Sequence, residues 1–236
     1  MTMKDNGLLA LWLHMEPQHE GALDAWYDTE HTDIVLEVPG VHGSRRFKER
    51  DMAGADAPKY LIFYEMRDET VQPSAAYQQI ADNPTPWSRY MRTLYEMQRR
   101  INYKLLSVHG GQASNAEKAM LMIRSEKIAD IDLPWQTEFA FQASRIKGCR
   151  SAHVYRAMPN KHGLPGGISG TSPDEVLEIY SFDARDSDQA LSWQELHRKY
   201  SEDRQASLKP LQYTVYVPTT APRRNCREVL RQSESA

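Results

Sequence analysis

Residues 8–15 read LLALWLHM, and residues 20–38 read EGALDAWYDTEHTDIVLEV. The first stretch alternates, with leucines on one face and Trp12 and His14 on the other, which predicts a strand. The second stretch predicts a helix, because Pro39-Gly40 directly after it is a helix stop signal. This strand and this helix open a pattern that continues through the rest of the chain.

The pattern runs through one half of the sequence and then repeats. In the first half, strand 8–15 and helix 20–38 are followed by strands at 41–50 and 59–66, a helix at 86–100 and a strand at 101–108. The second half offers the same order, with strand 119–126, helix 133–148, strands 149–158 and 175–182, helix 190–208 and strand 211–218. Each half therefore reads as a βαββαβ unit, the order of a ferredoxin-like fold.

We expect an α+β protein made of two tandem ferredoxin-like repeats whose sheets pack face to face as an α/β barrel. Helices cover one face of each sheet, and the apolar residues of the other face need a cover that the second sheet supplies. The expected domains are residues 1–109 and 117–220, joined at 110–117. Residues 221–236 are expected to form a polar, loosely held C-terminal tail.

Composition narrows the class of protein. The chain has 236 residues, a net charge of −3, 40% hydrophobic and 26% charged residues, which is typical of a folded globular protein and gives no reason to expect a nucleic-acid partner. The N-terminal apolar run is too short for a signal peptide, and no stretch has the length of a membrane span. We therefore expect a cytoplasmic protein. Cys149 and Cys226 are expected to be free thiols, and they form no zinc motif.

The first hundred residues resemble the EthD-like group of the dimeric α/β-barrel superfamily. The resemblance is carried by Trp26-Tyr27-Asp28-Thr29-Glu30-His31, by Val38-Pro39-Gly40-Val41 and by Arg45-Arg46-Phe47. It implies an enzyme for small aromatic or polyketide-like molecules, in a superfamily that includes dehydratases, decarboxylases, cyclases, isomerases and cofactor-free oxygenases. It also implies further pairing as a homodimer.

Chlorite-dismutase-like haem proteins share the tandem plan and the approximate length. That alternative requires an axial histidine in the second half, where His197 is the helical candidate. His197 lies among polar residues, which is typical of a surface position, so the expected cofactor is none. No metal site and no dinucleotide or nucleophilic-serine motif is present in the sequence.

Three residues of the first half are candidates for catalysis. His31 can exchange protons near neutral pH, and Glu30 or Asp28 could orient its ring or raise its pKa. Tyr64 could donate to a developing oxyanion, and Arg46, taken as the inward-facing arginine of its strand, could bind an anion. The alternatives are a helix-terminal histidine that satisfies the last carbonyls, a core tyrosine, and an arginine paired with an internal carboxylate such as Glu65.

Five further residues are candidates for substrate binding, with ordinary packing as the alternative. They are Trp12, His14, Trp26, Trp87 and Tyr90. The loop at 159–174 is open to two interpretations, a lid or a plain exposed loop.

The leading functional hypothesis is a cofactor-independent lyase or isomerase with His31 as general acid/base. A cofactor-free monooxygenase is the runner-up, and a ligand-binding barrel without chemistry is a third possibility. Because Phe139 falls opposite His31 when the two halves are aligned, we expect one working site per chain.

Overall fold

The computed structural model covers the chain and describes most of both halves. The described residues are 6–49, 60–110, 119–127, 134–145, 148–159, 175–183, 208–221 and 223–225.

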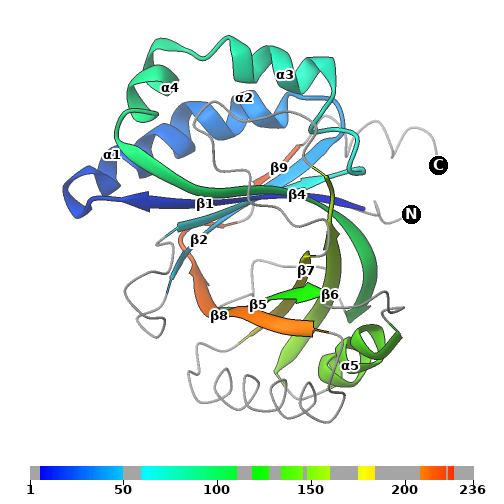
Figure 1. Ribbon diagram of the computed structural model, residues 1–236. Coiled ribbons are helices and arrows are strands. Elements are labelled where there is room, and N and C mark those ends of the chain that lie inside the picture. The colour runs from blue at the N-terminus through cyan, green and yellow to red at the C-terminus, as the bar shows by residue number, and fades with distance from the viewer. Residues whose placement is uncertain are drawn as a thin grey trace.

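The first half contains four strands and a set of short helices (Figure 1). In chain order these are β1 (Gly7–Met15), the 3-10 turn η1 (Pro17–His19), α1 (Glu20–Trp26), the π-helical turn η2 (Tyr27–His31), α2 (Thr32–Leu36), β2 (Val41–Glu49), β3 (Tyr60–Met66), α3 (Ala75–Asp82), α4 (Pro86–Met91) and β4 (Tyr95–Gly110). The second half contributes β5 (Ala119–Lys127), α5 (Pro134–Ser144), β6 (Cys149–Ala157), β7 (Glu175–Phe182), β8 (Leu208–Pro218) and the short β9 (Arg223–Arg224).

Eight strands form a closed antiparallel barrel. The hydrogen-bonded order is β3-β1-β4-β6-β7-β5-β8-β2, and β2 returns to β3. Within this ring, the first half has the order β4-β1-β3-β2 and the second half β8-β5-β7-β6, so corresponding strands occupy corresponding places. The two sheets are thus joined along shared edges, β4 with β6 and β2 with β8, in addition to facing each other.

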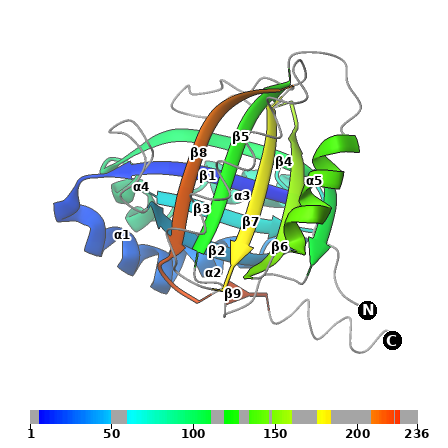
Figure 2. The ribbon, with the colours of Figure 1, turned by 90° about the horizontal axis from the view of Figure 1, so that it is seen from below.

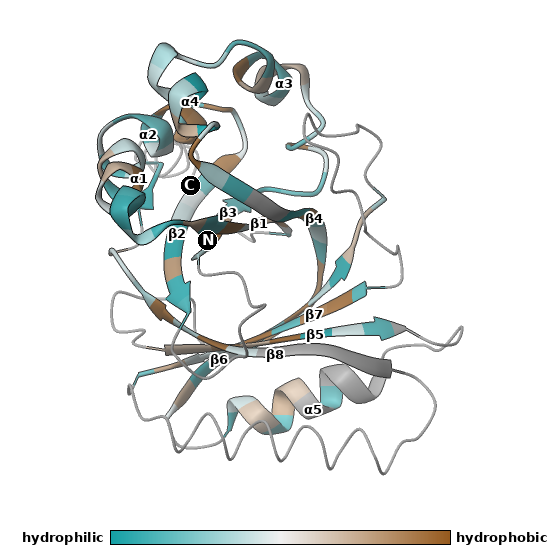
Figure 3. Cartoon of the chain, turned by 60° about the vertical axis from the view of Figure 1, so that its left-hand side comes forward, coloured by the Kyte–Doolittle hydropathy of each residue, from teal (hydrophilic) through white to brown (hydrophobic). Residues whose placement is uncertain are grey.

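The helices lie outside the barrel. Figure 3 shows α1–α4 against the outer face of the first-half sheet and α5 against the outer face of the second-half sheet. Figure 2 shows the second-half sheet and α5 from below. None of the described helices is long and apolar enough to cross a membrane. Residues 190–207 of the second helix expected in the second half lie outside the described residues, and Leu208 begins β8. The joint at 111–117, most of the 159–174 loop and Cys226 also lie outside the described residues.

Alternation along β1 separates two cores, as its sequence predicts. Leu9, Leu11 and Leu13 pack under the helices of the first half, whereas Trp12 points into the barrel interior. Tyr60, Ile62 and Tyr64 of β3 belong to the helix-facing core, and its alternate residues belong to the interior. A third core lies between the second-half sheet and α5. Alternate residues of β1 and β3 therefore face the helices and the barrel interior in turn.

The helix expected at 86–100 is wrong in its second half. Helix α4 ends at Met91, and β4 begins at Tyr95 and pairs with β1 as far as Met15. Residues 92–100 are rich in good helix formers, but the edge of β1 needs a hydrogen-bonding partner, and tertiary pairing overrides a weak local propensity.

The beginning of the expected loose tail is held in place. Arg223 and Arg224 pair with Ser44 and Gly43 of β2, and the Asn225 side chain donates to the carbonyl oxygens of Leu36 and Val41. A Cβ at Gly43 would lie 2.9 Å from both the Arg224 guanidinium and the Glu65 carboxylate, so glycine makes room for that ion pair. Residues 226–236 lie outside the described part of the chain.

Candidate functional site

The segment from Trp26 to His31 contains the π-helical turn η2, Tyr27–His31. The turn joins α1 to α2 without a break, so the chain is helical from Glu20 to Leu36. Single π-turns inside α-helices are rare and frequently occur at functional sites. The extra residue in the turn places the rings of Trp26, Tyr27 and His31 on the side that faces the sheet.

Aromatic rings surround His31, which is partly buried. Its imidazole stacks on Trp26 with ring centroids 4.1 Å apart and planes at 17°. Tyr27 and Tyr64 meet it edge-on, at 5.2 Å and 6.4 Å. No described residue donates to or accepts from its ring nitrogens. The ring is thus fixed by stacking while its nitrogens stay available for a ligand.

Burial lowers the pKa of His31 to about 3, and the positive charges of Arg92 and Arg100 lower it further. The ring is therefore neutral at physiological pH, and it is a weaker base than a free imidazole. The prediction that Asp28 or Glu30 raises this pKa is wrong, because both carboxylates have other partners.

Glu30 holds Trp26 in place through α4. Its carboxylate accepts from the hydroxyl of Thr85 at 2.6 Å and from that of Ser88 at 3.4 Å. Thr85 is the N-cap of α4, and Ser88 accepts from the Trp26 indole N–H at 3.3 Å. This chain of contacts fixes the surface on which His31 stacks, so Glu30 positions the ring indirectly.

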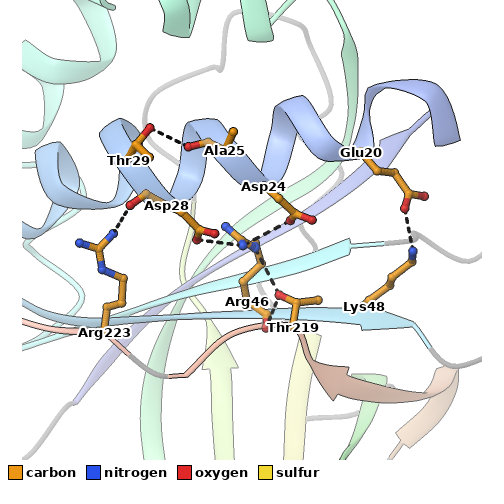
Figure 4. A network of polar contacts seen from close by, with 9 residues as sticks. All are labelled: Glu20, Asp24, Ala25, Asp28, Thr29, Arg46, Lys48, Thr219 and Arg223. Atoms are coloured by element: carbon orange, nitrogen blue, oxygen red, sulfur yellow. Dashed lines mark hydrogen bonds and ion pairs between the residues drawn. The ribbon is translucent and has the colours of Figure 1, made fainter.

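Asp28 is engaged by Arg46, as Figure 4 shows. The Arg46 guanidinium lies 3.0 Å from Asp28, 3.3 Å from Asp24 and 3.2 Å from the Thr219 hydroxyl, and it covers the ring of Tyr27. Arg46 therefore faces the helices and clamps α1 to β2. The choice of Arg46 as the inward-facing arginine is wrong.

Arg45 is the arginine of β2 that points into the barrel. It packs against the rings of Phe47 and Phe63 and pairs with Glu65 at 2.8 Å. The two neighbours face opposite sides because side chains alternate along a strand. The alternative considered for the inward-facing arginine, pairing with an internal carboxylate, is therefore the arrangement of Arg45 with Glu65.

Tyr64 joins the His31 layer from β3. Its hydroxyl is buried without a well-formed hydrogen bond to a described residue, and burial raises its pKa well above the usual value. The neighbouring hydroxyls of Tyr27, Tyr77 and Tyr95 raise that pKa further. Tyr64 is therefore a neutral hydroxyl that can donate to a ligand.

The other candidates lie in different places. Trp12 is fully buried in the barrel interior, under the guanidinium of Arg124 at 5.4 Å, on the other side of the sheet from His31. His14 is exposed, and Tyr90 is 56% exposed on α4. Trp87 is partly buried and packs at the edge of the helix-facing core. Of the eight candidates, His31, Tyr64, Trp26 and Arg46 share a layer, with Trp87 at its border.

Sequence reasoning missed three residues of this layer, Tyr77, Tyr95 and Arg100. Tyr95 lies 6.3 Å from Trp26, and Arg100 covers the ring of Tyr77 at 5.4 Å. Interpreting 92–100 as helix concealed the alternation that puts Arg99 and Arg100 on opposite faces. Pairing of Arg100 with Leu11 of β1 assigns it to the His31 side.

The barrel interior holds a separate ionic network. Glu175 accepts from Arg124 at 2.8 Å, from Arg99 at 2.7 Å and from the Tyr103 hydroxyl at 2.6 Å. These contacts hold the pKa of the Glu175 carboxyl below its usual range in spite of burial, which acts in the opposite direction. The charges are buried and paired, so removal of one partner would leave an uncompensated charge in the interior.

No cluster that could hold a metal ion is present among the described residues. His197, the residue on which a haem interpretation depends, lies outside them.

No family model matches the chain, and no curated protein matches its sequence. Solved structures of low sequence identity align over most of it. An anthrone oxidase-like protein has a TM-score of 0.61 at 13% identity, covering 96% of both chains. A candidate monooxygenase from Fusobacterium nucleatum has a TM-score of 0.60 at 7% identity, covering 92% of this chain and 94% of that one.

A chlorite dismutase variant from Candidatus Nitrospira defluvii, solved with cyanide, has a TM-score of 0.57 at 9% identity and covers 93% and 92% of the two chains. At these identities the likeness shows the fold. In this chain that fold is the closed antiparallel barrel described above.

Proposed function

We propose that this protein is a cofactor-independent oxygenase of the EthD-like type, acting on a small aromatic or polyketide-like substrate in the layer between α1–α4 and the first-half sheet. The observation that carries the proposal is the His31 ring, neutral and without a hydrogen-bonding partner, held between Trp26, Tyr27 and Tyr64. A neutral imidazole can abstract a proton from an acidic phenol or activated methylene once a bound substrate raises its basicity above that in the empty site.

Such chemistry needs a base and a site that stabilises an electron-rich anion. His31 accepts the proton, and the Tyr64 hydroxyl donates to the oxygen on which negative charge develops. The resulting carbanion can reduce O₂ directly. For an anthrone-type substrate the balance is CH₂ + O₂ → C=O + H₂O, in which one oxygen atom forms the new carbonyl and the other leaves as water.

A lyase or isomerase would use the same base without O₂. The names of the neighbours favour the oxygenase over these two. They include an anthrone oxidase-like protein and a candidate monooxygenase, and neither name points to a lyase. A lyase or isomerase remains the second candidate, because a neutral His31 beside a hydroxyl donor also suits dehydration or an enolising proton transfer. We extend the proposal to one working site per chain and to a homodimer.

Oxygen consumption separates these candidates. Purified protein without Soret absorbance should take up one O₂ per substrate converted when supplied with anthrones or polycyclic phenols, and ¹⁸O₂ should label the product. Turnover without O₂ uptake would establish a lyase or isomerase instead. Binding without turnover across such a panel would favour a ligand-binding barrel.

A further inference from the structure

The arginines of β2, β4 and β5 differ in one respect. Four of the five are paired with a carboxylate: Arg45 with Glu65, Arg46 with Asp28, and Arg99 and Arg124 with Glu175. Arg100 is the fifth. It makes no hydrogen bond or ion pair with any described residue, and its Nε is buried without a partner.

The surroundings of Arg100 are aromatic. Its guanidinium lies over Tyr77 at 5.4 Å, and its charge affects both Tyr95 and His31. A partly buried cation without a counterion is costly, because desolvation weakens its hydration and the Tyr77 ring replaces that hydration only in part. In the other four cases the chain supplies the anion itself. Beside His31 no described carboxylate does so, and Arg100 can therefore pair with an anion that a ligand brings.

We propose that Arg100 is the anion-binding residue of the His31 site and that the substrate is an aromatic compound carrying an anionic oxygen group. That the bound compound is a substrate rests on the proposed function. The proposal itself concerns binding, and it is tested without turnover. Arg suits this task because its planar fork can donate two parallel hydrogen bonds to a carboxylate. The flanking rings of Tyr77, Tyr95 and Trp26 would contact the aromatic body.

Anion binding would also act on the base. Arg100 is one of two arginines that disfavour protonation of His31, so a bound anion that neutralises it makes the imidazole more basic. Binding and proton abstraction are thereby coupled: His31 gains affinity for a proton when an acidic substrate is in place.

The test compares 1-naphthoate with its neutral isostere 1-naphthamide by calorimetric titration of the full chain. The wild type should bind naphthoate about 10- to 100-fold more tightly than naphthamide. Arg100→Gln should lower naphthoate affinity to the naphthamide level and leave naphthamide affinity unchanged, which also shows that the site is folded. Arg100→Lys should lie between the two. Arg89→Gln, at an exposed position of α4, removes the same charge and should change neither affinity.

A second readout follows the His31 ring by NMR. Its titration should move to higher pH when naphthoate is bound, and should stay in place with naphthamide. Equal affinities of the wild type for the two compounds, no binding of naphthoate, or unchanged discrimination in Arg100→Gln would each overturn the proposal. Failure of the oxygenase proposal is distinguishable, since it leaves this binding pattern intact and abolishes only O₂ uptake.

Discussion

The two faces of the first-half sheet use charge differently. On the barrel side, Arg45 and Arg99 each pair with a buried carboxylate of this chain, and Arg124 of the facing sheet pairs with the same Glu175 as Arg99. On the helix side, Arg46 is also paired with a carboxylate, but Arg100 and His31 are left without hydrogen-bonding partners among the described residues. Among the arginines of this sheet Arg100 is the exception, so we take the helix side as the face that is prepared for a ligand.

The largest effect on stability should come from removing the carboxylate of the buried ionic network in the barrel interior. Glu175→Gln removes the carboxylate charge that Arg124 and Arg99 share in the barrel interior, so the free energy of unfolding should fall by about 3–5 kcal/mol in a denaturant titration. Glu69→Gln is the control, because Glu69 pairs with the exposed Lys104 and should cost less than about 1 kcal/mol. Equal effects of the two changes would contradict the distinction between buried and exposed pairs.

Low pH should destabilise the protein through one histidine of the helix-facing layer and one of the barrel interior. Burial first, and then nearby arginines, lower the pKa of His31 to about 3 and that of His153, in the barrel interior, to about 4. The folded chain keeps both rings neutral, while the unfolded chain protonates them near pH 6.5, so stability is complete above that pH and falls as pH decreases toward the folded values. The loss should reach at most about 1.4 kcal/mol per pH unit for each ring.

His31→Gln and His153→Gln should each flatten the pH dependence of the unfolding free energy between pH 7 and 5, where paired carboxylates are still ionised. His14→Gln, at an exposed site, is the matched control for the loss of a histidine. An unaltered slope in His31→Gln would show that the ring is not desolvated in the folded state.

The smallest effect concerns the support of the stacking surface. Thr85→Ala removes the α4 N-cap and the partner of Glu30, and should cost about 1 kcal/mol of stability together with a several-fold rise in KM, because Ser88, the partner of Trp26, loses its contact with Thr85. Thr85→Ser retains the hydroxyl and should restore both. A Ser variant that behaves like Ala would show that the methyl group, and not the cap, is responsible.

The sequence predicts the strands and their faces well where the pattern is local. Alternation in β1 correctly separates the leucines from Trp12, and the Pro39-Gly40 stop correctly ends the first helical stretch. It fails at β4, where residues with high helix propensity pair with β1, and at Arg45-Arg46, whose faces depend on register with β3. Tyr77, Tyr95 and Arg100 come together only through that pairing. The return of residues 223–225 to β2 has no local signal either.

The most direct test of the account is oxygen uptake by wild type and His31→Ala under the same conditions, with a substrate that the wild type converts. We predict uptake of one O₂ per product by the wild type and a rate about 10²–10⁴ lower in His31→Ala, with a thermal midpoint close to that of the wild type and with His14→Ala fully active. Wild-type oxygen uptake by a folded His31→Ala protein would contradict the assignment of the helix-facing layer as the reactive site.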